Sequence, residues 1–368
     1  MTGLYVHVPF CVKKCGYCDF YSLPDKAGLI GEYVEAVKQE AGRYHHVECD
    51  TLYIGGGTPS LLGVKNLPAL LSGLYQTFDL RKMTEATIEV NPDSASYEFL
   101  RTAKMKGINR VSIGVQSLID SELKAAGRIH DARQATGAVM EARRAGFDSI
   151  SADLIVGLPG QDSQSLHFSL EYLTGLSIQH LSLYCLSIEP DTPFAANRPD
   201  ALPSDNTQAD LYEQCVDFLE HHGFIHYEIS NFAQPGFECK HNLNYWHGGE
   251  YVGLGPAAAS HLKNKRYKNK ADLEAYIKNP MGQVTEEETL VPAEKAAEEA
   301  MLRLRLLEEG LDIDEMSKRF GAENTEALTG RLVRLAAEGL LLRAGSKYRL
   351  PAEKVLISNP ILARVLGD

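Results

Sequence analysis

The chain has 368 residues, of which 44% are hydrophobic and 23% are charged, and its formal net charge is -12. This composition is typical of a globular protein, and the length is sufficient for one large domain and one smaller domain. The acidic balance argues against a phosphate-binding surface spread over the molecule, so we expect no nucleic-acid partner.

The chain enters a strand-like run (GLYVHVPF) at once, without the charged and apolar regions of a signal peptide. No run of about 18 apolar residues is present, so we expect no membrane-spanning helix. The seven cysteines are an odd number, with three clustered and four scattered, which disfavours a disulfide framework. We therefore expect a cytoplasmic protein.

Short runs rich in β-branched residues alternate with helix-like segments in the first half of the chain. The runs are 3–10, 51–57, 86–92, 109–117, 149–159 and 180–190. Such alternation predicts parallel βα units in an α/β fold. Nearly every run ends in a polar or glycine-rich motif, which favours a barrel with one common mouth over a doubly wound sheet with one crevice. Since six units are fewer than eight, we expect an open, three-quarter (β/α)6 TIM-like barrel of parallel strands.

The pattern changes after about residue 200. A helical segment and a strand-like segment precede the polar stretch 241–261, and from Pro292 the chain is strongly helical before a hairpin-like end. Three helices followed by a hairpin are the order of a winged-helix module. The expected domains are a partial barrel over 1–200, a barrel extension over 201–285 and a C-terminal helical, winged-helix-like domain over 286–368.

Cys11, Cys15 and Cys18 follow the first strand run at the spacing C-x3-C-x2-C. Structural zinc requires four ligands, for which His7 is a candidate, and a zinc-dependent deaminase would carry an H-x-E motif upstream of the cysteines, where none lies. Three ordinary thiols are the remaining alternative. A [4Fe-4S] cluster fits better, because it is held by thiolates and three of them leave one iron open to a small molecule.

This motif at the end of the first strand resembles the signature of the radical S-adenosylmethionine (SAM) enzymes. The resemblance implies that the open iron takes the amino and carboxylate groups of the cofactor. It also implies that the reduced cluster cleaves the sulfonium to give a 5′-deoxyadenosyl radical. Tyr17 stands where that family carries an aromatic residue beside the adenine.

Candidate cofactor contacts follow the later strand runs. Gly56 and Gly57 permit close backbone approach and Thr58 adds a hydroxyl, although an ordinary tight turn would look the same.

Glu89 is a candidate partner for the cofactor ammonium, or else a solvent-facing residue at a strand end. Gln116 and Asp153 are candidates for the ribose hydroxyls, and Asp153 lies in an apolar run, where an unpartnered carboxylate is costly. Arg128 can pair with the cofactor carboxylate.

A closer resemblance is to oxygen-independent coproporphyrinogen III dehydrogenase and its relatives. The matching pieces are YVHVPFC, GGGTPS, IEVNP, RVSIGVQS, GRIH, DLIVGLPGQ and LSIEPDTPF, which span 5–194 in the order of that family. The resemblance implies cofactor contacts by Tyr5, Gly56, Gly57, Thr58, Glu89, Gln116, Arg128, Asp153 and Ser187.

Two departures distinguish the chain from the dehydrogenase. Phe20 stands where the dehydrogenase has a fourth cysteine, and only four residues precede Tyr5, where the dehydrogenase has a longer segment. Both resemble the sister family of HemW-type haem chaperones, which carries the motif H-N-x-x-Y-W, here HNLNYW at 241–246. The resemblance favours His241 as a haem ligand, with His247 as a rival. From the residues alone, a structural histidine is the more frequent role.

The sequence therefore predicts a haem chaperone that delivers haem to apo-haemoproteins and carries a [4Fe-4S] cluster and a SAM site. Oxidative decarboxylation of coproporphyrinogen III by a radical enzyme is the alternative. A nucleic-acid-directed radical enzyme is a weaker third option, prompted by the winged-helix-like end. A homodimer, and peripheral membrane association through the client proteins, are further expectations.

Overall fold

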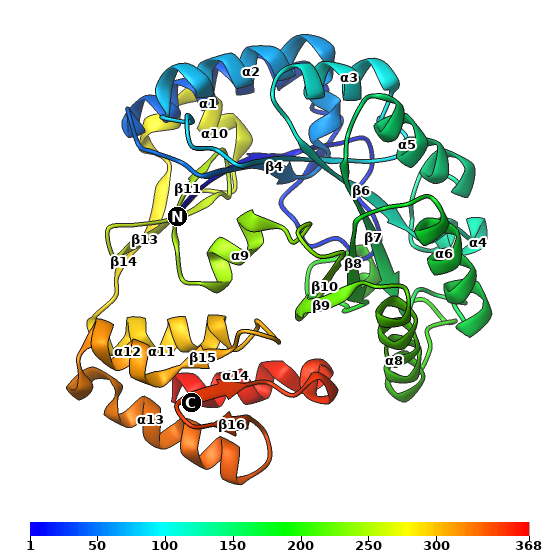
Figure 1. Ribbon diagram of the computed structural model, residues 1–368. Coiled ribbons are helices and arrows are strands. Elements are labelled where there is room, and N and C mark those ends of the chain that lie inside the picture. The colour runs from blue at the N-terminus through cyan, green and yellow to red at the C-terminus, as the bar shows by residue number, and fades with distance from the viewer. Residues whose placement is uncertain (368) are drawn as a thin grey trace.

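The central feature of the computed structural model, which describes residues 1–367, is a curved twelve-stranded sheet with helices along its outer face (Figure 1). The strand order is β14-β13-β12-β11-β1-β4-β5-β6-β7-β8-β10-β9. Aliphatic side chains such as Leu52, Ile88 and Val111 are fully buried, because parallel strands are covered on both faces. The six predicted parallel strands are confirmed as β1 Thr2–Val8, β4 Thr51–Gly56, β5 Glu85–Val90, β6 Arg110–Gln116, β7 Ser149–Val156 and β8 His180–Cys185.

Helices connect these strands along the outside of the barrel, as right-handed crossovers require. Two of them begin with capping boxes, in which Asp131 and Asp162 accept the N–H groups of Gln134 and Ser165. The helices are α1 Ile30–Ala41, α2 Gly63–Thr77, α3 Tyr97–Met105, α4 Asp120–Ala125, α5 Ala132–Arg144, α6 Ser163–Gly175 and α8 Asp205–His221.

The parallel part of the sheet is one strand wider than the sequence predicts. Strand β11, Glu250–Leu254, runs parallel to β1, with Gly3 opposite Tyr251. Its residues come from the polar stretch after position 241, in which no strand was expected. Antiparallel strands extend both edges: β12 Ala259–Leu262, β13 Lys265–Asn269 and β14 Val284–Thr289 on one side, β10 Asn231–Ala233 and β9 Ile225–Glu228 on the other.

The HNLNYW motif forms a short helix, α9 Lys240–Trp246, which lies between the sheet and the C-terminal helices (Figure 1). The carboxylate of Glu85 on β5 accepts the backbone N–H groups of Lys240 and His241 at 2.9 and 3.0 Å. An acidic group is stabilising at a helix N-terminus, because it pairs with N–H groups that have no partner within the helix. The motif is therefore fixed on the barrel by its first turn.

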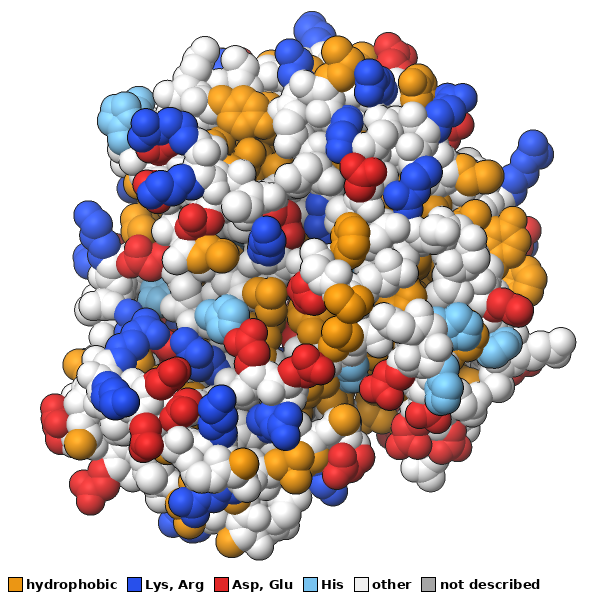
Figure 2. All heavy atoms as spheres, viewed as in Figure 1, with side chains coloured by type: hydrophobic (Ala, Val, Ile, Leu, Met, Phe, Trp, Pro, Cys, Tyr) orange, Lys and Arg blue, Asp and Glu red, His pale blue; other side chains and the backbone are white. Residues whose placement is uncertain are grey.

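The C-terminal part contains four helices and a small sheet, which lie below the barrel in Figure 1. Residue Leu306, which follows helix α11 (Pro292–Arg303), forms a β-bridge with Glu228, and His247 pairs with Glu309 at 2.8 Å. Basic and acidic side chains are interspersed over this part (Figure 2). Its elements are α11 Pro292–Arg303, β15 Leu311–Asp312, α12 Ile313–Phe320, α13 Ala322–Ala337, β16 Leu342–Ala344, β17 Lys347–Arg349 and α14 Ser358–Leu366.

The remaining short elements connect these parts. They are β2 Phe10–Cys11, β3 Leu23–Pro24, α7 Pro193–Ala196 and α10 Leu273–Lys278. Among residues 1–367, none of the helices combines the length and the apolar content needed to cross a bilayer.

Candidate functional site

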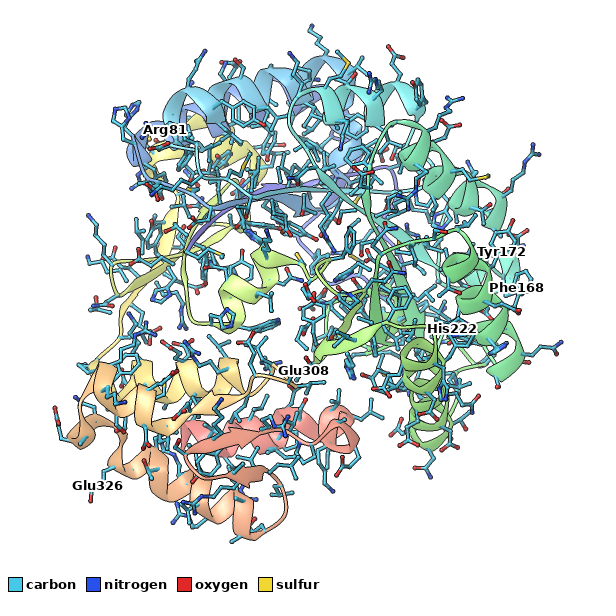
Figure 3. All side chains as sticks on the ribbon, in the orientation of Figure 1. Arg81, Phe168, Tyr172, His222, Glu308 and Glu326 are labelled. Carbon is cyan, nitrogen blue, oxygen red and sulfur yellow. The ribbon has the colours of Figure 1, made fainter. Side chains whose placement is uncertain are left out.

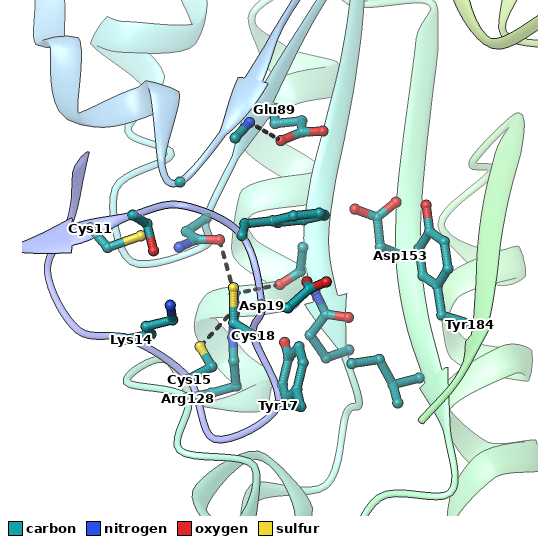
Figure 4. Close-up of a pocket in the computed structure, with 18 of the residues that line it drawn as sticks. Cys11, Lys14, Cys15, Tyr17, Cys18, Asp19, Glu89, Arg128, Asp153 and Tyr184 are labelled. Carbon is teal, nitrogen blue, oxygen red and sulfur yellow. Dashed lines mark hydrogen bonds between the residues drawn. The ribbon is translucent and has the colours of Figure 1, made fainter. Parts of the chain in front are cut away.

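A cavity of about 280 Å³ lies at the carboxyl ends of the parallel strands (Figure 4). This is the edge at which βα barrels build their sites, because the loops after all strands converge there. The structure therefore brings together most of the residues that the sequence singles out. Those that line the cavity are Cys11, Cys15, Tyr17, Cys18, Gly56, Gly57, Glu89, Gln116, Arg128, Asp153 and Ser187.

The three cysteines share one segment after β1, and its position is fixed by contacts with the loops that follow β4 and α4. The backbone of Gly16 donates to the carbonyl of Ala126 at 3.0 Å. A guanidinium nitrogen of Arg128 lies 3.5 Å from the Cys15 sulfur, and the Thr58 hydroxyl lies 3.4 Å from the Cys11 sulfur. All three thiols line the same cavity, so one group bound there can take all of them as ligands.

The donor set fits an iron–sulfur cluster. Three thiolates and no imidazole are the soft ligands that such clusters use. Within residues 1–367, no three His, Cys, Asp or Glu side chains are gathered closely enough to hold a single metal ion. A cube-shaped cluster takes its thiolates at separate corners. Burial raises the pKa of the Cys18 thiol to about 11, so ligation at neutral pH requires a metal that displaces its proton.

His7 does not complete a zinc site with these cysteines. One of its ring nitrogens lies 3.0 Å from the Tyr5 hydroxyl and the other lies 2.8 Å from the Tyr21 carbonyl oxygen. Both nitrogens are therefore already in hydrogen bonds, and the ring lines a different cavity, described below.

Glu89 presents a carboxylate to the cavity from the end of β5. The hydroxyl of Tyr53 donates to one oxygen at 2.7 Å, and the backbone N–H of Gly56 donates to the other at 3.1 Å. Burial, with a contribution from the nearby Asp153, raises the pKa of Glu89 to about 7 despite these hydrogen bonds. A buried carboxylate that is costly to ionise alone is suited to a cationic ligand such as an ammonium group.

Asp153 and Gln116 stand on neighbouring strands beside Glu89. Burial raises the pKa of Asp153, while the Ser112 hydroxyl donates to its carboxylate at 3.1 Å. Gln116 has a φ of 68°, and the pairing of β6 with β7 shifts register between Ile113 and Gln116. A positive φ at a glutamine is strained, and such strain is typical of residues whose side chains are directed at a ligand.

Asn91 also lines the cavity, although the sequence predicts no cofactor role for it. Its side chain accepts from the Arg128 guanidinium at 3.0 Å and donates to the Thr58 hydroxyl at 3.0 Å. Asn91 therefore links Thr58, which contacts the Cys11 sulfur, to Arg128, which contacts the Cys15 sulfur. Its place in the IEVNP motif, two positions after Glu89, is the signal that could have identified it.

Two of the predicted cofactor contacts lie away from the cavity wall. Thr58 is 1% exposed and lies behind Cys11, in contact with its sulfur, so its hydroxyl supports a cysteine instead of facing the cavity. Tyr5 lines the second cavity on the other side of the cysteine loop. Ser187 does line the cavity, and its hydroxyl donates to Glu189 at 2.6 Å. The roles predicted for these residues stay predictions.

His241 is buried between the sheet and α9. Its Nδ1 lies 2.9 Å from the Thr51 hydroxyl and its Nε2 lies 2.9 Å from the Tyr245 hydroxyl. Burial, with a contribution from Arg110, lowers the pKa of His241 to about 3, so the ring is neutral. The ligand role predicted for His241 thus requires that one of these two hydrogen bonds break. Its rival His247 pairs with Glu309.

Comparison with known proteins places the chain among radical SAM proteins. Residues 5–173 match the Radical SAM superfamily, and residues 290–356 match the HemN C-terminal domain. The solved structure of coproporphyrinogen III oxidase (HemN) from Escherichia coli, a radical SAM enzyme, has a TM-score of 0.87 with 24% identity, covering 100% of this chain and 90% of that one. At this identity the likeness concerns the fold.

Similarity to curated proteins extends over the whole chain. Heme chaperone HemW of Lactococcus lactis is 33% identical, covering 100% of this chain and 98% of the relative. Heme chaperone HemW of Bacillus subtilis is 33% identical with 100% of both chains covered, and that of Escherichia coli is 39% identical over 70% of this chain and 69% of the relative. With the cysteine loop and cavity described above, these similarities show that the chain belongs to the Heme chaperone HemW family of the radical SAM superfamily.

Proposed function

We propose that the protein binds haem and transfers it to apo-haemoproteins, and that it carries a [4Fe-4S] cluster and SAM in the cavity at the strand ends. The observation that carries the proposal is the placement of the HNLNYW motif. Its Tyr245 and Trp246 line a second cavity of about 700 Å³ next to the cysteine loop. That volume is within the range of roughly 300–1,000 Å³ that is usual for ligand sites.

The cofactor cavity supports the second half of the proposal. Cys11, Cys15 and Cys18 would hold the cluster, Glu89 would take the ammonium of SAM, and Gln116 and Asp153 would take its ribose hydroxyls. The bound cluster would supply a redox centre with an open iron. Tyr17 supports an adenine site, because its ring packs against the apolar group formed by Ala126, Ile155 and Leu158.

Decarboxylation of coproporphyrinogen III is disfavoured by Phe20. This residue takes the position of the fourth cysteine of the dehydrogenase, and its side chain is 58% exposed beside the cysteine loop. The fold is shared by both families, so it does not separate the two activities. Apo-haemoproteins as clients, a homodimer, and membrane association through clients belong to the proposal as expectations.

The test is an anaerobic titration of the reconstituted protein with haem, followed through the Soret band, and then transfer of the bound haem to an apo-haemoprotein. We expect saturable binding near one haem per chain and recovery of the client's spectrum. Absence of saturable binding, together with turnover of coproporphyrinogen III, would instead establish the radical enzyme.

A further inference from the structure

The second cavity is built from several parts of the chain that lie far apart in the sequence. Its floor is one face of the β11–β12–β13 sheet, which carries Tyr251, His261, Arg266 and Lys268. Alternate residues of a strand share a face, so these side chains point to the same side. The other walls come from α9, from the cysteine loop and from α11, which provides Lys295, Glu298, Glu299 and Leu302.

Aromatic rings make up much of the wall. Tyr245 of α9 meets Tyr251 of β11 edge to face, with ring centroids 4.7 Å apart, and Trp246 lies under the guanidinium of Arg305 at 5.3 Å. The remaining rings that line the cavity are Tyr5, Phe20 and Tyr21. Aromatic side chains offer large, rigid apolar faces, which suit a flat conjugated ligand.

His261 is the histidine of this cavity that retains a free ring nitrogen. It lines the cavity, it is 8% exposed, and its buried Nε2 has no hydrogen-bond partner among the described residues. Burial lowers the pKa of His261, and Lys295 and Arg266 lower it further, so the imidazole is neutral. Neutral imidazole is the form that ligates a metal. Both ring nitrogens of His7 and of His241 are already in hydrogen bonds.

Charged groups stand beside His261. Arg266 lies opposite His261 in the β12–β13 pair, and it forms ion pairs with Glu298 and Glu288. The ammonium of Lys295 contacts the side-chain oxygen of Asn264. Lys268 lies two residues after Arg266 on the same face of β13, and it forms no ion pair within residues 1–367. The acidic side chains on the wall are Asp19, Glu298 and Glu299, and Glu299 is held by Arg303 and Arg319.

We propose that the second cavity binds the haem, with the imidazole of His261 as the ligand of the iron and with Lys268 and Arg266 near the propionate carboxylates. His241 is then a positioning residue, because its hydrogen bond orients Tyr245 on the cavity wall. This inference rests on the proposed function and names the site at which haem is held. A flat apolar face, a neutral imidazole and cations at one edge match the three chemical parts of an iron porphyrin.

The test is a set of ferric haem titrations on the reconstituted full chain, comparing wild type with His261→Gly, His241→Gln, His247→Ala and His222→Ala. His222 lies on the outer surface at the end of α8, away from both cavities, and serves as the matched control (Figure 3). Each complex is recorded by absorption and by electron paramagnetic resonance, with and without added imidazole. Circular dichroism checks that every variant is folded.

We expect His261→Gly to weaken haem binding on the order of 100-fold and to lose the axial-histidine signature, which added imidazole restores. The other three variants keep that signature. The haem affinity of His241→Gln should fall by less than that of His261→Gly. If wild type binds haem and His261→Gly keeps the same spectrum, the ligand assignment is overturned while the proposed function stands. Loss of the signature in His241→Gln or His247→Ala, with rescue by imidazole, would move the ligand there. Absence of haem binding in wild type would overturn the proposed function itself.

Discussion

Glu89 is held so that its carboxylate can change charge when a ligand arrives. The Tyr53 hydroxyl and the Gly56 backbone fix its two oxygens, and burial raises its pKa to about 7. In the cluster-free chain, where no iron takes the amino group of SAM, its ammonium pairs with the ionised form of Glu89, so binding below this pKa must release a proton. Because the folded pKa lies above the ordinary value of 4.5, the folded chain holds this proton more tightly than the unfolded chain.

The affinity for SAM should therefore increase as the pH rises through about 7 and then level off. In Glu89→Gln we expect a loss of about 1.5–3 kcal/mol, roughly ten- to a hundredfold in Kd, with no pH dependence over that interval. Isothermal titration at several pH values measures both effects. Glu98→Gln, on an exposed turn of α3, is the matched control. A pH-dependent Kd that survives in Glu89→Gln would assign the proton to another group.

The same residue gives a prediction for stability. Its contribution to the free energy of unfolding is fully present below about pH 4.5 and is lost as the pH rises through about 7, because the buried carboxylate must then ionise. Denaturation of the SAM-free protein at a series of pH values should show this decline, and Glu89→Gln should lessen it. An unchanged decline in the variant would contradict the prediction.

Gly57 allows the cysteine loop to lie against the second strand. A Cβ at this position would lie 2.6 Å from the carbonyl oxygen of Phe10 and 3.1 Å from the sulfur of Cys11. We expect Gly57→Ala to displace the loop and to lower the iron and sulfide bound per chain, while the chain stays folded. Gly137→Ala is the matched control, since a Cβ there would meet nothing within 4 Å. Full cluster content in Gly57→Ala would show that the loop adapts.

Helix α1 secures the added strands of the barrel through one buried carboxylate. Glu40 is fully buried, and it accepts hydrogen bonds from the backbone of Gly255, the amide of Asn269 and the hydroxyl of Tyr276 at 2.5–2.8 Å. These three donors belong to the segments around β11, β13 and α10. The carboxylate thus holds the floor of the second cavity to the radical SAM barrel.

Glu40→Ala should lower the free energy of unfolding by about 1–3 kcal/mol or more, because three buried donors lose their acceptor. Glu35→Ala on the exposed face of the same helix should have little effect, since its ion pair with Lys38 is solvent-exposed. Denaturation monitored by circular dichroism compares the two variants. Equal stability of both would contradict the role given to Glu40.

The regular elements were predictable from the sequence because their patterns are local. The six β-branched runs became the parallel strands, and the polar motifs at their ends line one cavity, since parallel strands place these ends together. The strand β11 was missed because its sequence, EYVGL, is short and follows a polar stretch without a clear period. The helical form of HNLNYW was missed because its first turn is capped by Glu85, which lies over 150 positions away.

Side-chain direction was the part of the site that the sequence could not provide. Thr58 and Gly57 are adjacent in the chain, yet Gly57 lines the cavity and Thr58 lies behind Cys11. His241 belongs to a recognisable motif, but its hydrogen bonds with Thr51 and Tyr245 depend on how α9 packs on β4. His261 has no motif at all, and its free nitrogen is visible only once β11, β12 and α11 are assembled.

Over the whole molecule, the second cavity lies between the barrel and the C-terminal part, so haem binding should slow amide hydrogen exchange in both. We expect added protection in β12 and in α11, at His261 and Lys295 respectively, and no change in α6 on the outer face. Hydrogen exchange measured by mass spectrometry with and without haem checks this. Protection confined to the cysteine loop would place the haem elsewhere.

Asp19 and Phe20 belong to the walls of both cavities. The two chambers therefore have a common partition, and a ligand that shifts it on one side alters the space on the other. Thermodynamic linkage makes such an influence mutual: if SAM changes the affinity for haem by some factor, haem changes the affinity for SAM by the same factor. If SAM and haem are bound as proposed, Phe20 and Asp19 are the residues through which each ligand would affect the other.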